Sequence, residues 1–154
     1  MALPSVLNIH DVSQAIQLAL GPVFLLTGIA GMLNVMTGRL ARIIDRGRHL
    51  AETELPADPQ VRASIDAELG SLERRRHLAG AAITACTFAA LLVCMVVAAL
   101  FLEVVLSAPL KWLVGLLFTA SMLALVVGLA YFLREVHLAT STVRIPLHEG
   151  SQLR

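Results

Sequence analysis

Residues 78–102 read LAGAAITACTFAALLVCMVVAALFL, an apolar run without a charged side chain. As an α-helix this run extends about 37 Å at 1.5 Å per residue, which exceeds the roughly 30 Å hydrocarbon core of a bilayer. Two further apolar runs, 15–37 and 112–133, lie on either side of it in the chain. The sequence therefore predicts an all-α membrane protein with three transmembrane helices.

The composition of the 154-residue chain supports this fold class. The chain is 57% hydrophobic and 15% charged, and its mean hydropathy is +0.78. Soluble proteins average about 45–50% hydrophobic and about 25% charged residues. A soluble enzyme, a secreted disulfide scaffold and a disordered tail are excluded, because none of them tolerates uncharged stretches of about twenty residues.

Basic residues cluster between the first and second apolar runs. Eight of the 12 basic residues lie in this connection: Arg39, Arg42, Arg46, Arg48, Arg62, Arg74, Arg75 and Arg76. The positive-inside rule therefore places the connection in the cytoplasm. The N-terminal segment 1–14 and the loop 103–111 are then periplasmic, and the tail 134–154 is cytoplasmic.

The connection 38–77 is predicted to form a cytoplasmic helical hairpin. Apolar residues recur at three- and four-residue intervals on both sides of Pro56–Pro59, a turn signal that also supplies Asp58 as a helix N-cap. They are Leu40, Ile44, Gly47 and Ala51 before the turn and Val61, Ile65, Leu69 and Leu72 after it. Each membrane helix then continues into the cytoplasm, and the two arms cover each other's apolar stripe. The alternative is an amphipathic helix that lies flat on the membrane with its arginines on lipid phosphates.

Small residues recur along the second apolar run at a strict spacing of four. They are Ala82, Cys86, Ala90, Cys94 and Ala98. A stripe of this kind lets another helix approach closely, and we expect such a contact either within the subunit or between subunits. The two cysteines lie eight residues apart on one helix, so they cannot form a disulfide with each other.

The first apolar run carries a face of polar and small residues. It consists of Thr27, Gly28, Gly31, Asn34 and Gly38. An amide inside the bilayer needs a hydrogen-bonding partner or water, which makes Asn34 the decisive residue of this face. In one interpretation the face is the wall of a pore in an oligomer. In the other it is an ordinary packing face, and Asn34 bonds to a neighbouring helix.

A basic stripe follows this face directly. Arg39, Arg42 and Arg46 lie at positions i, i+3 and i+7, and Asp45 is within reach of Arg42 on a helix. Such a stripe suits three roles: it binds anionic lipid headgroups, it holds a subunit interface, or it forms a vestibule that favours anions.

No recognisable pattern of catalytic or metal-ligating residues occurs in the sequence. The five histidines are scattered over both expected sides of the membrane, without an HExxH motif or a paired Cys/His spacing. The apolar runs contain no carboxylate for acid–base chemistry. We therefore expect no catalytic residue, no metal site, no cofactor and no enzymatic activity.

Two stretches resemble a known family. They are PVFLLTGIAGMLNVMTGRLARIIDRGR at residues 22–48, where LLTG is followed by RLARIIDR, and FLREV at residues 132–136. Together they resemble domain of unknown function 2721, an uncharacterised bacterial membrane family, and the likeness covers residues 10–140. It implies a small inner-membrane protein with three membrane helices. It implies no reaction, ligand or cofactor.

Two functions are consistent with these sequence features. The first is a channel-like homo-oligomer whose first membrane helices surround a path for small ions, because three helices alone cannot enclose a water-filled path. It is favoured by the occurrence of Gly21–Pro22, the polar face and the basic stripe on one helix. The second is a non-conducting structural or accessory subunit that docks a cytoplasmic protein partner through the hairpin, and the absence of intramembrane charge favours it. The expected partners are the lipid bilayer and further copies of the chain, and no nucleic acid.

Overall fold

The computed structural model describes residues 9–52, 58–106 and 109–141, and these form three helices. They are α1 (Ile9–Glu52), α2 (Pro59–Leu106) and α3 (Lys111–Ser141). All three are long and apolar enough to cross a membrane. The prediction of an all-α protein with three membrane-spanning helices is confirmed to this extent. Residues 1–8, 53–57, 107–108 and 142–154 lie outside the described residues, and they include the first half of the predicted turn and two residues of the loop 103–111.

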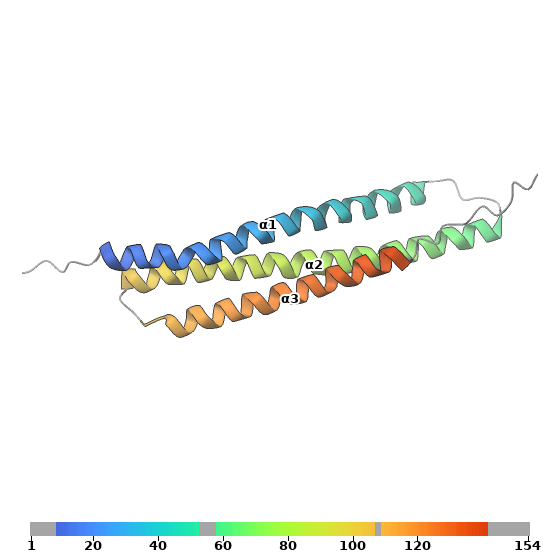
Figure 1. Ribbon diagram of the computed structural model, residues 1–154. Helices are drawn as coiled ribbons and strands as arrows, with labels where there is room; N and C mark the ends of the chain where they lie inside the picture. Colours follow the sequence, from blue (N-terminus) through green and yellow to red (C-terminus); the bar gives the residue numbers. More distant parts are fainter. Residues whose placement is uncertain (1–8, 53–57, 107–108, 142–154) are drawn as a thin grey trace, which may run out of the picture.

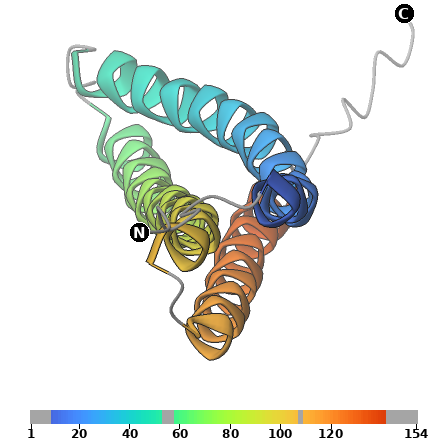
Figure 2. The ribbon, with the colours of Figure 1, turned by 90° about the vertical axis from the view of Figure 1, so that its left-hand side faces the viewer.

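Helix α2 is the centre of the arrangement. The chain runs up and down, so α2 is antiparallel to both α1 and α3 (Figure 1). It packs extensively against each of them, whereas the backbones of α1 and α3 come close at few positions. Seen from the end at which α1 begins, the three helix axes do not lie in one plane (Figure 2).

The contacts between the helices follow a seven-residue repeat. On α1, Ile29, Met36 and Ile43 are buried at intervals of seven. The buried positions of α2 alternate mainly between spacings of three and four: Leu72, Ala79, Ala82, Cys86, Ala89, Val93, Val96 and Ala99. This spacing is that of a left-handed coiled coil, in which each helix presents one continuous seam to its neighbour. The helices are therefore held together along their length by small and medium apolar side chains.

Helices α2 and α3 are in close contact at Gly128. A Cβ atom at this position would lie 2.6 Å from Sγ of Cys86 and 3.2 Å from the backbone nitrogen of the same residue. The same Cβ would also lie 3.3 Å from the carbonyl oxygen of Ala82. Only glycine fits without a shift of the helices, so Gly128 sets the distance between α2 and α3.

The start of α2 matches the predicted cap. A side-chain oxygen of Asp58 accepts a hydrogen bond from the backbone nitrogen of Gln60 at 2.9 Å, and its carbonyl accepts one from Arg62 at 3.1 Å. Pro59 is the first residue of the helix, where its missing N–H has no cost. Asp58 is therefore confirmed as the N-cap of α2. Helix α1, in contrast, continues through Pro22.

Beyond the apolar runs, α1 and α2 continue as helices and pack together. Ile43, Leu72 and Ala79 form a buried cluster with Leu40 and Leu50 around it. Ile44 is covered only in part: it is 40% exposed and, with Leu69 and Leu72 of α2, lines an open cavity between the two helices. Ile43 lies seven residues after Met36, so it is the residue of this pair that is buried against α2. The location of these helix extensions in the cytoplasm stays a prediction.

Candidate functional site

The carboxylate of Glu135 is fully buried where the three helices meet. Its Oε2 atom accepts a hydrogen bond from Nε of Arg39 on α1 at 3.1 Å and lies 3.0 Å from Nη2 of the same guanidinium. Its Oε1 atom accepts from Nη2 and Nε of Arg75 on α2, at 3.0 and 3.3 Å. Each oxygen thus binds one guanidinium, and a single carboxylate from α3 joins all three helices.

The position of these three residues follows from the lengths of the apolar runs. Arg39 comes two residues after the run on α1 ends, Arg75 comes three residues before the run on α2 begins, and Glu135 comes two residues after the run on α3 ends. Three membrane helices of similar span reach the bilayer surface together, so charged residues just beyond the three runs meet at one level. Arg39 also lies over the ring of Phe132, 5.7 Å from its centre.

The burial of Glu135 makes its two partners necessary. Its side chain is 0% exposed, whereas those of Arg39 and Arg75 are 29% and 22% exposed. A buried carboxylate that loses its partners is strongly destabilising, because neither water nor another donor replaces them. The arginine guanidinium suits this role, since it is always charged and its neighbouring N–H groups reach the same carboxylate oxygen.

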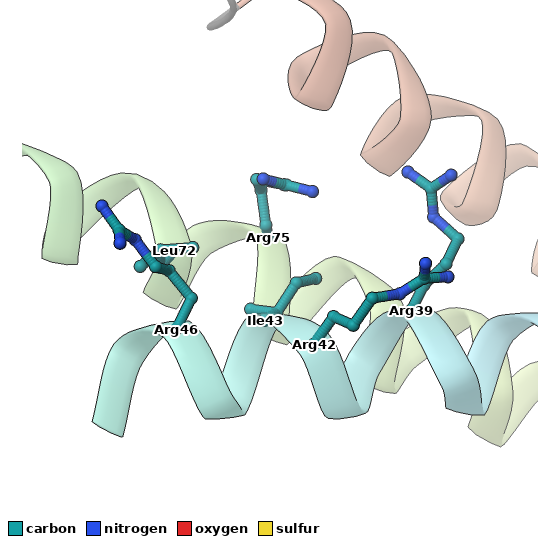
Figure 3. A pocket seen from close by; sticks show the side chains of 6 residues that line it. All are labelled: Arg39, Arg42, Ile43, Arg46, Leu72 and Arg75. Carbon is teal, nitrogen blue, oxygen red and sulfur yellow. The ribbon is translucent and has the colours of Figure 1, made fainter. Parts of the chain in front are cut away.

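A cavity of about 330 Å³ opens beside this ion-pair network. It is lined by Arg39, Arg42, Ile43, Arg46, Leu72 and Arg75. Figure 3 shows that the lining side chains of α1 lie on the side of this helix that faces Arg75 and Leu72 of α2. Arg46 binds Glu68 at 2.9 Å. Arg42 donates from Nε to the carbonyl of Gly38 at 3.3 Å, and within the described ranges no carboxylate pairs with it.

The structure shows which residues of the predicted basic stripe are paired with acidic residues of other helices. Arg39 and Arg46 are each paired with an acidic residue of another helix, and only Arg42 is left without one among the residues described. Asp45 is exposed. Arg75, one of the basic residues of the connection 38–77, lines the cavity from α2 together with Leu72.

The predicted polar face of α1 lies opposite its contact with α2. All five residues of this face are exposed: Thr27, Gly28, Gly31, Asn34 and Gly38. No atom of another helix lies within 4 Å of a Cβ built at Gly28, Gly31 or Gly38. Thr27 bonds to the carbonyl of Val23 in its own helix, and the Asn34 side chain has no hydrogen-bonding partner in the described part of the chain. Within one chain, this face is uncovered.

The predicted small-residue stripe of α2 is divided between two environments. Ala82 and Cys86 are fully buried and contact the α3 backbone position Gly128. Ala90 is half-buried, and Cys94 and Ala98 are exposed. A spacing of four advances about 40° around the helix at every step, so the stripe leaves the seam after two residues. A contact of Cys94 and Ala98 with another subunit stays a prediction, and both cysteines are free.

Glu135 is the residue that sequence reasoning missed. It appeared only as part of the FLREV segment that resembles the family. One signal could have identified it: Ser121, Gly128 and Glu135 are spaced by seven and are the buried positions of α3, so the carboxylate occupies a seam position. Among the described residues, no three His, Cys, Asp or Glu side chains come together as metal ligands.

Comparison with known proteins gives one match. The sequence profile of a family described as Protein of unknown function (DUF2721) matches residues 19–145, which include Arg39, Arg75 and Glu135. The resemblance seen in the sequence is thereby confirmed over most of the chain. No curated protein and no solved structure matches it.

Proposed function

Because the chain belongs to the DUF2721 family, whose description assigns no activity, we propose its function from its geometry. We propose a homo-oligomeric membrane protein, channel-like, in which α1 lies nearest the centre and its polar face borders a path for small ions. The observation that carries this proposal is that the polar face of α1 is turned away from both other helices and is uncovered. In this proposal the protein has no catalytic role and needs no cofactor.

The bilayer supplies the physical reason for an oligomer. An amide such as that of Asn34 is costly to expose to hydrocarbon, where neither water nor a donor is present. Glycines that meet no side chain leave room for a second helix at close range. A second copy of α1 offers the same combination of small and polar groups, so self-association covers both faces at once.

The charged residues that come after the polar face of α1 favour a water-filled path over a direct contact between α1 helices. Arg42 and Asp45 follow Gly38 on α1 at spacings of four and three, and both are exposed. Arg42 lies at the edge of this side, where it also borders the cavity between α1 and α2. In an oligomer with α1 at its centre, these residues form a ring of alternating charge at the mouth of the path. Charged rings of this kind concentrate and select small ions.

A second function has its own support. Ile44 and Val61 are apolar residues on the extensions of α1 and α2, and they are 40% and 42% exposed. Ile44 also lines, with Leu69 and Leu72, an open cavity of about 310 Å³ between these extensions, and an apolar groove between helices suits a protein partner. In that case the chain is a non-conducting structural or accessory subunit that docks a cytoplasmic partner through these extensions.

The substitution Asn34→Leu separates these functions. The full chain is purified in detergent, its oligomeric mass is measured, and ion flux is recorded after reconstitution into liposomes. A path lined by Asn34 loses flux through dewetting while the oligomer persists. If Asn34 only bridges helices, the variant loses about 0.6–2 kcal/mol of association free energy, and the oligomer weakens.

The control is Val126→Leu, which adds apolar volume to an exposed position of α3. It should change neither mass nor flux. A monomeric parent would contradict the oligomer. A correctly assembled parent without flux, in several salts and at both voltage signs, would contradict the channel and support the accessory function.

A further inference from the structure

We propose that the cavity beside Glu135 is a binding site for a phosphate monoester dianion. The cavity lies between α1 and α2 within a single chain, so this inference does not depend on the oligomer or on ion conduction. Its volume of about 330 Å³ lies at the lower end of the range of ligand pockets. Its lining is dominated by four arginines (Figure 3).

The charge of the cavity matches a dianion. Glu135 is shared between Arg39 and Arg75, and Glu68 pairs with Arg46. Arg42 has no carboxylate partner among the described residues. Four guanidinium groups are therefore opposed by two carboxylates, which leaves an excess of two positive charges. A phosphate monoester carries about −1.5 to −2 charges at pH 7, so it balances this excess.

Hydrogen-bond donors remain available at the cavity. Glu135 occupies Nε and Nη2 of both Arg39 and Arg75, and their Nη1 groups make no hydrogen bond within the described residues. Arg42 and Arg46 each engage only Nε, so their terminal amino groups are also free there. Arginine donors in this number are suited to bind the three oxygens of a phosphate group. Ile43 and Leu72, which are both buried, complete the lining.

Glu135 acts as a positioning residue in this site. It holds Arg39 and Arg75 at the end of the cavity nearest the apolar runs and relieves part of their mutual repulsion. It cannot neutralise the cluster, because one carboxylate faces two guanidinium groups. The remaining charge is what a bound phosphate would balance.

The cavity begins at the level of lipid headgroups. Arg39 follows the end of the first apolar run by two residues and Arg46 by nine, which corresponds to about 3 and 13 Å along the helix. The phosphate monoester is therefore offered either by a lipid headgroup or by a small molecule in solution. Both sources present the same chemistry to the arginines.

Calorimetric titration of the full chain in neutral detergent tests the proposal. Three probes are used: inorganic phosphate, dioctanoyl phosphatidic acid, which has a phosphate monoester, and dioctanoyl phosphatidylglycerol, which has a singly charged diester. We expect one saturable site for the monoester. If phosphatidic acid binds much more tightly than inorganic phosphate, the source is a lipid; if the two bind equally, the source is soluble.

The variant Arg42→Gln should weaken this binding at least tenfold, because a charged donor with no other acidic partner is removed. Arg74→Gln is the matched control: it makes the same change on exposed α2 surface outside the cavity and should leave binding unchanged. Arg42→Lys keeps the charge without the fork and should give an intermediate loss, which also covers the case in which the glutamine variant does not fold. The proposal is overturned if no probe saturates, if phosphatidylglycerol binds as well as phosphatidic acid, or if Arg74→Gln weakens binding as much as Arg42→Gln.

Discussion

Arg39 and Glu135 are separated by 96 residues in the chain, and their side chains meet at 3.0 Å. Their ion pair links α1 directly to α3, two helices whose backbones come close at few positions. Arg75 extends the link to α2 through the other oxygen of the same carboxylate. The relative position of the three helices at this end of the membrane runs therefore depends on one buried side chain.

Replacing Glu135 with Gln should lower the free energy of unfolding by about 3 kcal/mol, because two guanidinium groups then face each other without a compensating charge. The partial exposure of both arginines keeps the effect near the lower end of the usual range. Thermal unfolding in detergent measures the loss. Glu73→Gln is the control, since Glu73 is 66% exposed and pairs only within its own helix, so little change is expected.

A double variant makes this prediction specific to the ion-pair network. Arg39→Gln should cost much less in the Glu135→Gln background than in the parent, because its acidic partner is already absent. Equal costs in both backgrounds would mean that Arg39 and Glu135 do not interact.

The substitution Gly128→Ala should destabilise the contact between α2 and α3 by about 1–3 kcal/mol, the cost of inserting a methyl group into a closely packed seam. The new Cβ would meet Sγ of Cys86 at 2.6 Å. Adding Cys86→Ala should restore only part of the stability, because two backbone atoms also lie within 3.3 Å. Gly115→Ala is the matched control: no atom lies near its Cβ, and alanine favours the helix by up to about 1 kcal/mol.

The sequence predicted the fold well because the bilayer imposes a simple rule. Long uncharged runs must be helices, so three runs predicted three helices, and Asp58 before Pro59 predicted where α2 begins. The pairing of charges could not be predicted in this way. Glu135 meets Arg39 and Arg75 only because the heptad phases of three helices agree. The small-residue stripe predicted on α2 from a spacing of four also differs from the seam that is buried, which follows spacings of three and four.

The expected orientation is tested by cysteine labelling. In a chain whose Cys86 and Cys94 are both replaced by alanine, we introduce Ala57→Cys or Ser107→Cys. A membrane-impermeant maleimide added to intact cells should label the cysteine at 107 and not the one at 57, because the eight arginines of the first connection hold it in the cytoplasm. Labelling after lysis shows that both positions react. The reverse pattern in intact cells would contradict the orientation.

The substitution Glu68→Gln gives the sharpest test of the phosphate site, since it predicts a gain rather than a loss. Arg46 and Glu68 are 53% and 40% exposed, so breaking their ion pair should lower the free energy of unfolding by less than about 1 kcal/mol. The same change releases the Arg46 side chain and raises the positive excess around the cavity from two charges to three. Monoester binding should therefore become about three- to tenfold tighter, the opposite sign to Arg42→Gln. Asp66→Asn removes an exposed acidic residue two positions away and should have a smaller effect. If Glu68→Gln left the affinity unchanged or lowered it, Arg46 would not belong to the phosphate site.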